Sequence, residues 1–359
     1  MNDNTQTKKP RSRVALLVVC IILAVILVAA VAVCIFLKNF SFSGNFGINM
    51  IDPSTTPPTY SSEELEDILG PTETVETEPI FEEAEPIFVG KDIINILLVG
   101  QDKRSGQSQK RQRTDAMILC TINKATKTVT MTSFMRDLWV YVPGKYNQRL
   151  NAPYVIGGFP LLNETLSYNF GVSADYNVEI DFEGFMKSID IIGGIDVELT
   201  KKEAEYLNER GNWDIEPNVG WTLKEGVNRL TGSQALAYTR IRKIDNDFER
   251  TNRQRKVLNI LIEKAKTLGI SDLYRLAKEI MPNLTTDMND KQIFGLIVDM
   301  LPMLSDLNII SQRIPTAGAY YYARTEKNQS VLMMKPEHVE KNKALLIEAM
   351  KTKFVETLS

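Results

Sequence analysis

The most chemically informative part of the sequence is an arginine-rich segment, residues 238–256, which holds five Arg and two Lys. Arg240 and Arg242 are two positions apart, and on an extended chain that spacing directs both side chains to the same side. A second group has the i, i+3, i+4 spacing of one helical face, and it comprises Arg250, Arg253 and Gln254. Because guanidinium groups match phosphate oxygens with paired hydrogen bonds, we expect both groups to bind one phosphate-bearing ligand.

Two alternative roles of this segment are open. Most runs of charge belong to solvated helices, but such a helix favours alternating Lys and Glu, whereas this one continues into apolar Val257 and Leu258. Arginine clusters also bind the phosphates of nucleic acids. Arg255, one position past Gln254 and about 100° around a helix from it, is expected to lie outside the ligand-binding group.

A pair of carboxylates forms the second candidate site. Asp102 follows an apolar run that ends at Val99, and Asp115 begins the next apolar run thirteen residues later. An excursion of that length can return like a hairpin and bring the two carboxylates together. Such a pair, without histidine or thiolate, suits Mg²⁺ or Mn²⁺ with substrate phosphates as further ligands. The alternative is a structural role, because aspartate is common at strand ends. Arg104, in the same excursion, is a candidate substrate-binding residue.

Two further arginines follow along the chain. Arg136 comes directly after the predicted strand 128–134, so we expect it at the same edge of the sheet as the aspartates. Arg149 precedes an Asn-Ala-Pro-Tyr sequence at 151–154, which leads into Gly157-Gly158. We expect Arg149 to contact the substrate.

The composition excludes several classes of enzyme. The single histidine, His338, lies at a predicted helix start, which argues against a Ser-His-Asp triad and a histidine-rich zinc site. Cys120 is the one thiol beyond the apolar N-terminal segment, so no intrachain disulfide is expected there, and its apolar neighbours predict burial. The sequence has no Gly-x-x-x-x-Gly-Lys-Ser/Thr motif, and no ATP site is expected.

Residues 14–37 predict one transmembrane helix, because 24 successive residues carry no charge. The residues that precede this run are basic, and they include Lys8, Lys9, Arg11 and Arg13. Since such residues collect on the cytoplasmic side, we expect a single-pass protein with its N-terminus in the cytoplasm and its C-terminal domain outside the cell membrane. The alternative, a cleaved signal peptide, has a shorter apolar region of roughly 7–15 residues.

Charge divides the rest of the chain. Residues 41–90 hold eleven Asp or Glu and no Lys or Arg, which is typical of an extended tether. Although the whole chain has a net charge of −3, residues 91–359 carry +4, which suits an anionic ligand. The predicted domains are a basic tail at 1–13, the membrane helix at 14–37, an acidic tether at 38–91 and a catalytic domain at 92–352. An external domain argues against nucleic acid as a partner.

Apolar patterning in that domain predicts strands alternating with helices, which is typical of an α/β or α-β-α layered fold. The expected strands are 93–99, 117–122, 128–134, 138–142, 178–182, 195–199, 308–314 and 330–334. The expected helices are 161–170, 185–192, 201–209, 232–239, 250–268, 272–281, 289–304 and one from 336.

The motifs of the domain, taken in order, resemble those of the LytR–CpsA–Psr family over roughly residues 92–350. The motifs are Gly100-x-Asp102, Arg113-Thr114-Asp115, Arg136-Asp137, the Asn-Ala-Pro-Tyr and Gly-Gly sequences, Asp181-Phe182-Glu183-Gly184-Phe185, Gly193-Gly194-Ile195-Asp196-Val197, Arg240-x-Arg242, Asp247-Phe248-x-Arg250 and Arg253-Gln254. The resemblance implies one extracytoplasmic α-β-α domain with a central mixed β-sheet after a transmembrane helix. It also implies a Gram-positive bacterial source.

The resemblance implies roles for these residues. Asp102 and Asp115 would hold Mg²⁺ against a pyrophosphate, and Asp247 would orient arginines or act as a base. The residues expected to bind pyrophosphate oxygens are Arg136, Arg240, Arg242, Arg250 and Gln254. Arg149 stands where the family often has Lys, which keeps the charge and changes the geometry. Asn246 departs from the family's Gly-Asp-Phe stretch.

The implied activity is the transfer of a glycopolymer from polyprenyl pyrophosphate to peptidoglycan, outside the membrane and assisted by Mg²⁺. The polymer would be a teichoic acid, a capsular polysaccharide or another wall polysaccharide. One alternative is a pyrophosphatase that releases the same polymer to water. Another is a non-catalytic envelope protein that binds lipid pyrophosphates.

Overall fold

The described part of the computed structural model consists of residues 49–50, 82–101, 114–209, 220–245, 247–266, 284–289, 292–293, 296, 303, 307–325 and 328–351. The predicted membrane segment, most of the predicted tether, the predicted helix at 272–281 and most of the predicted helix at 289–304 lie outside these residues. Among the helices of the described part, none is long and apolar enough to cross a membrane.

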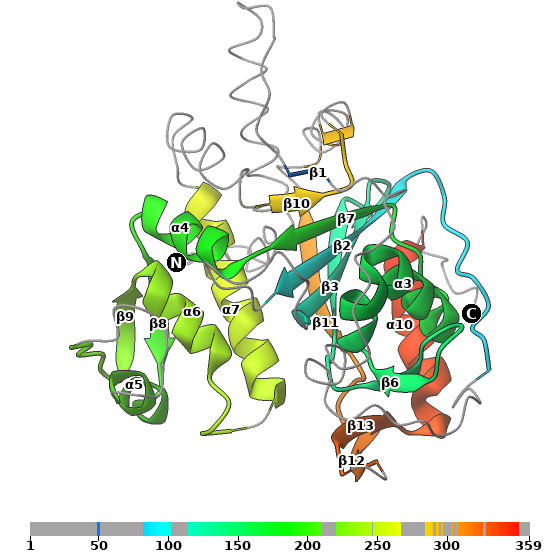
Figure 1. The fold of residues 1–359 in the computed structure, drawn as a ribbon. Helices are drawn as coiled ribbons and strands as arrows, with labels where there is room; N and C mark the ends of the chain where they lie inside the picture. The colour runs from blue at the N-terminus through cyan, green and yellow to red at the C-terminus, as the bar shows by residue number, and fades with distance from the viewer. Residues whose placement is uncertain are drawn as a thin grey trace, which may run out of the picture.

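A seven-stranded mixed sheet forms the centre of the fold (Figure 1). Its strands, in spatial order, are β1 (Asn49–Met50), β10 (Leu284–Thr286), β7 (Tyr176–Ile180), β2 (Ile93–Gln101), β3 (Thr114–Asn123), β4 (Thr128–Phe134) and β11 (Asn308–Ile314). β2 runs parallel to β7, and β4 runs parallel to β11, while β3 is antiparallel to both of its neighbours. The carboxyl ends of β2, β4, β7 and β11 therefore meet at one edge.

Both faces of the sheet are buried, and its central strands β2 and β3 carry apolar residues on both of them. In β2, Ile96 and Leu98 face one core, whereas Leu97 and Val99 face the other. The first core is covered by α4 (Phe182–Ile191), α6 (Gly232–Arg240) and α7 (Asp247–Lys266). The second is covered by α3 (Ala152–Phe170) and α10 (Val339–Met350), which follows the short 3-10 turn Pro336–His338. These layers confirm the predicted α/β fold with a central mixed sheet.

Three two-stranded sheets surround the central one. β5 (Trp139–Tyr141) pairs with β6 (Asn147–Arg149), and β12 (Tyr320–Arg324) pairs with β13 (Ser330–Met334). On the other side of the view, β8 (Ile195–Leu199) pairs with β9 (Gly226–Leu230) next to α5 (Lys201–Asn208) (Figure 1).

Most predicted elements are confirmed, and Cys120 is fully buried as expected. The helix expected at 161–170 instead begins at Ala152 and is kinked at Gly158, whose φ of 66° and ψ of −154° are not helical. The strand expected at 178–182 lies two residues earlier in the chain, at Tyr176–Ile180. The sequence did not predict β6, β9 or β12, each of which is short or largely polar.

Candidate functional site

The candidate site lies at the edge where β2, β4 and β11 end and β3 begins. Ligands bind outside the carboxyl ends of strands in many α/β sheets, because loops and helix ends converge there. Met135, directly after β4, donates its N–H to the carbonyl of Ile314 at the end of β11, 2.9 Å away. This bond aligns the residues that follow the two strands.

The backbone at the start of β3 departs from regular strand pairing at one of the two predicted metal ligands. Gln101 pairs with Thr114 and Gly100 with Ala116, so Asp115 is the extra residue of a β-bulge. Asp102, the next residue after Gln101, and Arg104 both lie outside the described residues. In the described part of the chain, no three Asp, Glu, His or Cys side chains gather as metal ligands. The side chain of Asp115 also lies outside the described part of the chain, so the Mg²⁺ site remains a prediction from the sequence.

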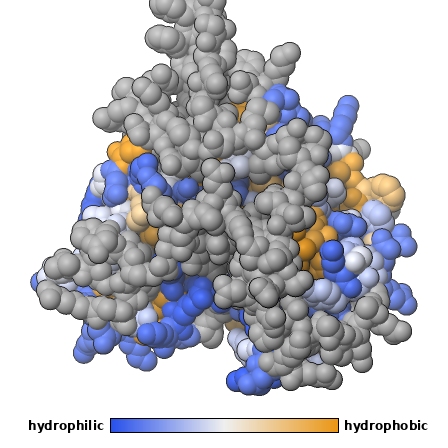
Figure 2. Space-filling view, viewed as in Figure 1, coloured by the Kyte–Doolittle hydropathy of each residue, from blue (hydrophilic) through white to orange (hydrophobic). Residues whose placement is uncertain are grey.

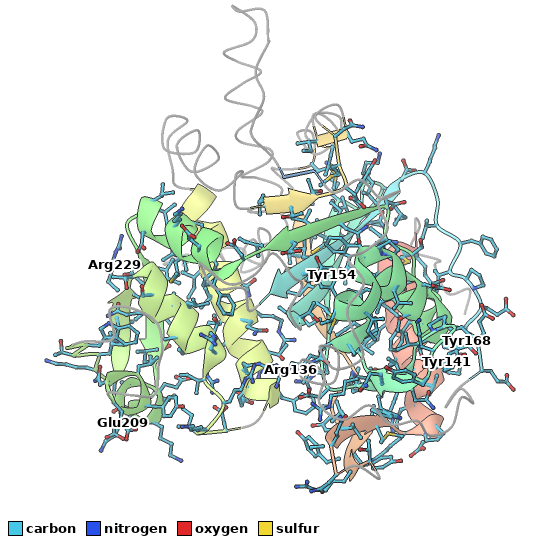
Figure 3. All side chains as sticks on the ribbon, viewed as in Figure 1. Arg136, Tyr141, Tyr154, Tyr168, Glu209 and Arg229 are labelled. Carbon is cyan, nitrogen blue, oxygen red and sulfur yellow. The ribbon has the colours of Figure 1, made fainter. Side chains whose placement is uncertain are left out.

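Arg136 lies in the turn after β4, beside α7 (Figure 3). Its Nε is 3.5 Å from a carboxylate oxygen of Asp137, and its carbonyl accepts a hydrogen bond of 3.1 Å from the N–H of Asn151. The second bond ties the turn to the segment that carries Arg149. The two arginines, 13 residues apart in sequence, are thus held in neighbouring segments.

Arg149 ends β6, opposite Trp139 of β5. Its Nε is buried and makes no hydrogen bond within the described residues. A buried donor without a partner lowers the stability of the fold by roughly 1–3 kcal/mol, unless a ligand or a water molecule accepts a hydrogen bond from it. A few residues later, the hydroxyl of Tyr154 donates to Glu179 on β7, which links the Asn-Ala-Pro-Tyr sequence to the central sheet.

The end of α6 carries Arg240 and Arg242. The helix starts at a capping box built on Thr231, and the chain becomes extended at Ile241, with φ −54° and ψ 128°. Ile241 is fully buried and Arg242 is exposed. The Arg240 guanidinium lies 4.7 Å from the ring centre of Phe182, which fixes its direction by a cation–π contact. The extended chain at Ile241 agrees with the spacing argument for these two arginines.

The first turns of α7 pack against the end of β4. Asp247 begins the helix, and the hydroxyl of Thr251 lies 3.6 Å from the Met135 sulfur. Arg250 is only 2% exposed and is among the largest fully buried side chains of the described residues. Gln254, one turn further along, is half-buried. A buried guanidinium next to the strand ends provides a fixed positive charge at this edge.

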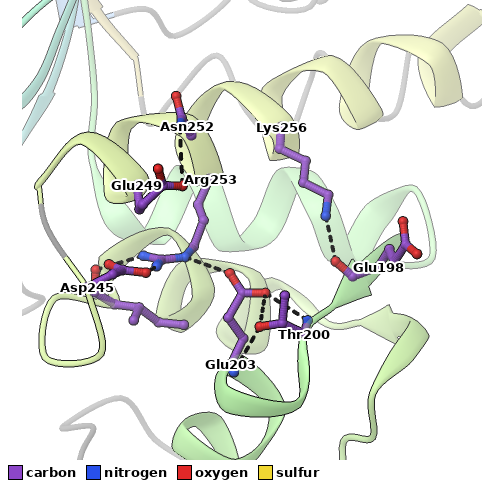
Figure 4. Close-up of polar contacts among 9 residues, drawn as sticks. Glu198, Thr200, Glu203, Asp245, Glu249, Asn252, Arg253 and Lys256 are labelled. Carbon is purple, nitrogen blue, oxygen red and sulfur yellow. Dashed lines mark hydrogen bonds and ion pairs between the residues drawn. The ribbon is translucent and has the colours of Figure 1, made fainter. Parts of the chain in front are cut away.

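Arg253 does not lie free for a substrate, contrary to the expectation from helical spacing. Its Nε bonds to Glu203 on α5 at 2.9 Å, its Nη1 donates to the carbonyl of Ile241 at 3.0 Å, and its Nη2 pairs with Asp245 (Figure 4). Glu203 in turn accepts from the N–H of Thr200 at the start of α5. The geometry therefore favours a positioning role, in which Arg253 holds the segment that carries Arg240 and Arg242.

Tyr238 completes this arrangement. Burial, the nearby Glu203 carboxylate and a hydrogen bond to that carboxylate raise the pKa of Tyr238 above its usual range, although Arg253 acts in the opposite direction. The phenol therefore keeps its proton at physiological pH. The segment before Arg240 is thus anchored by a permanent hydrogen-bond donor.

Arg313 is a basic residue at this edge that sequence reasoning missed. It is the penultimate residue of β11, where it pairs with Ser133 of β4, and its guanidinium lies 4.1 Å from the ring centre of Phe248. The available signal was its place at the end of a predicted strand, which matches the place of Arg136 after β4.

Comparison with known proteins identifies relatives of the whole described domain. A model of the LytR_cpsA_psr family matches residues 64–348. The polyisoprenyl-teichoic acid–peptidoglycan teichoic acid transferase TagT of Bacillus subtilis (strain 168) is 30% identical over 238 residues, which cover 65% of this chain and 72% of TagT. The regulatory protein MsrR of Staphylococcus aureus (strain COL) is 30% identical over 243 residues, or 67% of this chain and 70% of MsrR.

The fold has solved counterparts as well. A structure of TagT bound to LI-WTA superposes with a TM-score of 0.59 at 25% identity, and the match covers 75% of this chain and 96% of that one. The family match extends over most of the chain and includes every motif quoted above. This chain belongs to the LytR_cpsA_psr family.

Proposed function

We propose that this protein transfers a glycopolymer from a polyprenyl pyrophosphate carrier to peptidoglycan. The observation that carries the proposal is the convergence on one sheet edge of segments that carry one fully buried and two partly buried arginines. Arg136 comes from the end of β4, Arg149 from β6 and Arg250 from α7. A diphosphate supplies the several negative oxygens that such a group needs.

The relatives support the same chemistry. TagT is named as a transferase that joins teichoic acid from a polyisoprenyl carrier to peptidoglycan, and it has been solved with LI-WTA bound. For this chain the polymer is a teichoic acid, a capsular polysaccharide or another wall polysaccharide. The reaction takes place on the outer side of the cell membrane, with residues 14–37 as the anchor and the N-terminus in the cytoplasm.

The proposed step is one phosphoryl transfer. A hydroxyl oxygen of peptidoglycan attacks the phosphorus that carries the polymer, and the bond from that phosphorus to the bridging oxygen breaks. Polyprenyl phosphate leaves with the bond's electron pair, and the hydroxyl proton passes to a carboxylate or to solvent. Asp247, at the start of α7, is the candidate base or orienting residue. The pyrophosphate supplies the driving force, so the arginines need only position it and offset its charge.

Asp102 and Asp115 are the residues that would hold Mg²⁺, or Mn²⁺, against the pyrophosphate. A divalent ion there would supply further neutralisation of the phosphate charge. The other residues act directly on the substrate: Arg240 and Arg242 from the end of α6, Gln254 from α7, and Arg104 from the β2–β3 excursion are proposed to bind its oxygens.

The experiment uses the full-length protein, a polyprenyl-pyrophosphate-linked polymer with a labelled sugar, and purified peptidoglycan. Label joined to peptidoglycan through a phosphodiester supports transfer, whereas release of free polymer phosphate alone identifies a pyrophosphatase. Tight lipid binding without turnover in the presence of Mg²⁺ identifies a non-catalytic binding protein. Either of the last two results overturns the proposal.

Two variants separate the site from general surface charge. Arg242→Gln removes an exposed arginine whose loss leaves the core intact, and we expect transfer to fall about tenfold to a hundredfold. Arg229→Gln removes an exposed arginine of β9, which pairs with Asp196, and should leave transfer unchanged. Asp115→Asn should lower transfer and weaken its dependence on added Mg²⁺.

A further inference from the structure

A second basic cluster lies next to the residues proposed to bind the pyrophosphate, and the proposed function has so far assigned it no role. It consists of Arg255 on α7 and Arg313 on β11. Phe248 and Arg255 are seven residues apart on α7, which brings them to within about 20° of each other around the helix. Arg250 and Gln254 occupy a different face, so the helix presents two separate groups of basic and polar residues.

Arg313 is held against a stack of aromatic rings. Its guanidinium lies 4.1 Å from the ring centre of Phe248, and Tyr320 of β12 stacks on the same ring with centres 4.4 Å apart. Tyr322 meets Tyr320 edge to face at 5.9 Å, and it is 59% exposed. The cluster therefore continues into an exposed aromatic surface on β12, which Figure 1 places at the lower end of the molecule.

The charges of the cluster are poorly balanced. Burial and the neighbouring Arg313 lower the pKa of Arg255, and burial lowers the pKa of Arg313. Glu249 is the carboxylate that offsets both arginines, but it is exposed and also accepts a 3.3 Å hydrogen bond from Asn252. Arg255 also donates to the side-chain oxygen of Asn252, and Arg313 donates to the carbonyl of Pro315 at 3.3 Å. These two partners carry no charge, so among the described residues the pair of arginines favours the binding of an additional anion.

Ser133 gives an independent indication of a ligand. It pairs with Arg313 across the two parallel strands, so both side chains leave the same face of the sheet. On the opposite face, the next pair is satisfied, because Gln312 donates to the hydroxyl of Thr132 at 2.9 Å. The Ser133 hydroxyl is buried and has no hydrogen-bond partner among the described residues. Buried hydroxyls are usually paired, and a ligand oxygen or bound water would satisfy this one.

We propose that Arg255 and Arg313, together with the tyrosines of β12, form a second anion subsite that binds a phosphate or carboxylate group of a sugar chain. Flat aromatic rings with polar tips suit sugars, because the ring face packs on C–H groups while the hydroxyl donates hydrogen bonds. In Figure 2, the coloured atoms along the lower edge of the view are mainly hydrophilic. The assignment of a sugar chain rests on the proposed function, whereas the anion subsite rests on the geometry alone.

The test is a binding assay on the full-length protein with four probes. A poly(glycerol phosphate) oligomer represents an anionic polymer, and a soluble peptidoglycan fragment carries carboxylates. A neutral oligosaccharide and farnesyl pyrophosphate are the remaining probes. For the double variant Arg255→Gln/Arg313→Gln we expect at least about tenfold weaker binding of one anionic sugar probe. Binding of farnesyl pyrophosphate should stay within about twofold of the wild type. The probe that is lost shows whether the subsite serves the polymer or the acceptor.

Matched variants keep this test decisive. Arg229→Gln removes an exposed arginine of β9, which belongs to a different sheet from β12, and it should leave all four probes unchanged. Tyr322→Ser alters only the exposed end of the aromatic surface, and we expect it to weaken the same sugar probe by about threefold to tenfold. Tyr322→Ser also replaces the double variant as the test if circular dichroism shows that the latter is unfolded.

Three results would overturn the subsite. If the double variant binds both the poly(glycerol phosphate) oligomer and the peptidoglycan fragment as well as the wild type does, the proposed subsite does not exist. Equal weakening by Arg229→Gln would show a diffuse basic surface. An equal loss of farnesyl pyrophosphate would place the two arginines in the diphosphate site. If the wild type fails to bind farnesyl pyrophosphate yet binds an anionic sugar through Arg255 and Arg313, the proposed function fails and the subsite survives.

Discussion

The contacts of Arg253 allow a quantitative prediction. Replacing it with Met keeps much of the side-chain volume and removes the charge, leaving the carboxylates of Glu203 and Asp245 without their partner. Arg253 is 4% exposed, Glu203 12% and Asp245 24%. Removing one member of a buried ion pair costs about 3–5 kcal/mol, and the partial exposure of Asp245 favours the lower end of that range. Since about 1 kcal/mol shifts the melting temperature by roughly 2–4 °C in a domain of this size, we expect a decrease of about 6–12 °C.

Arg229 provides the matched control for this measurement. It pairs with Asp196 at 3.2 Å, but both side chains are more than half exposed, at 55% and 56%. Exposed pairs contribute at most about 1 kcal/mol, so Arg229→Met should lower the melting temperature by less than about 4 °C. Thermal unfolding followed by circular dichroism measures both variants. Equal shifts would refute the claim that the buried network holds this part of the fold.

The same variant also tests the positioning role. Arg253→Lys retains a charge but cannot reach Glu203, Ile241 and Asp245 together, so it should recover part of the stability. If Arg253 acts only by holding the segment of Arg240 and Arg242, its loss should reduce turnover and substrate affinity together. These values should be measured well below the melting temperature of the variant. Full activity in a destabilised but folded Arg253→Met protein would show that the segment needs no such support.

Three further predictions test other features. Gly194→Ala should destabilise the protein more than Gly144→Ala, as measured by urea unfolding. Both glycines have positive φ, but only at Gly194 would an added Cβ lie 2.7 Å from a backbone oxygen, that of Leu230. Equal effects of the two substitutions would contradict this prediction. Burial raises the pKa of Asp175 in the folded protein above the value of about 3.9 that it has in the unfolded chain. The contribution of Asp175 to stability therefore decreases as the pH rises from the unfolded-state pKa through the folded-state pKa. Asp175→Asn should therefore remove part of that pH dependence and leave stability near pH 7 equal or higher, and a large loss at pH 7 would contradict the sign. Arg240→Lys should lower transfer at least about tenfold in the labelled-polymer assay, since an ammonium cannot make two parallel hydrogen bonds to phosphate; wild-type transfer would exclude a two-pronged contact.

The central sheet was predictable from the apolar residues of its strands, which lie on both faces in β2 and alternate with threonine in β4. The strand predicted at 128–134 has the observed bounds of β4, and the strands predicted at 308–314 and 330–334 have those of β11 and β13. β9 escaped prediction because it is a two-stranded, largely exposed element, and its Val227 is 73% exposed. Such strands bury little surface, so pairing rather than hydrophobic periodicity defines them.

The sequence shows which residues are candidates for the site, but it does not show which of them contact one another. Helical spacing correctly groups Arg250, Arg253 and Gln254 on one side of α7. It cannot show that Arg253 meets Glu203, which lies 50 residues earlier in the chain and is brought close only by the packing of α5. Arg313 was missed for a similar reason, since its neighbour Phe248 belongs to a distant helix. Contacts between remote segments decide which arginines remain available to a ligand.

The parallel pairing of β11 with β4 has a consequence for folding. The two strands are joined residue by residue from Asn308–Thr128 to Ile314–Phe134, although 180 residues separate each pair. Contacts between such distant segments form slowly, because the entropy cost of closing a long loop comes before the stabilisation that the paired strands provide. Until β11 is synthesised, the outer edge of β4 stays open to pairing with other chains. The strand that completes the sheet also delivers Ile314 to Met135 at the candidate site, so a nascent chain acquires its binding edge only at the last stage of its folding.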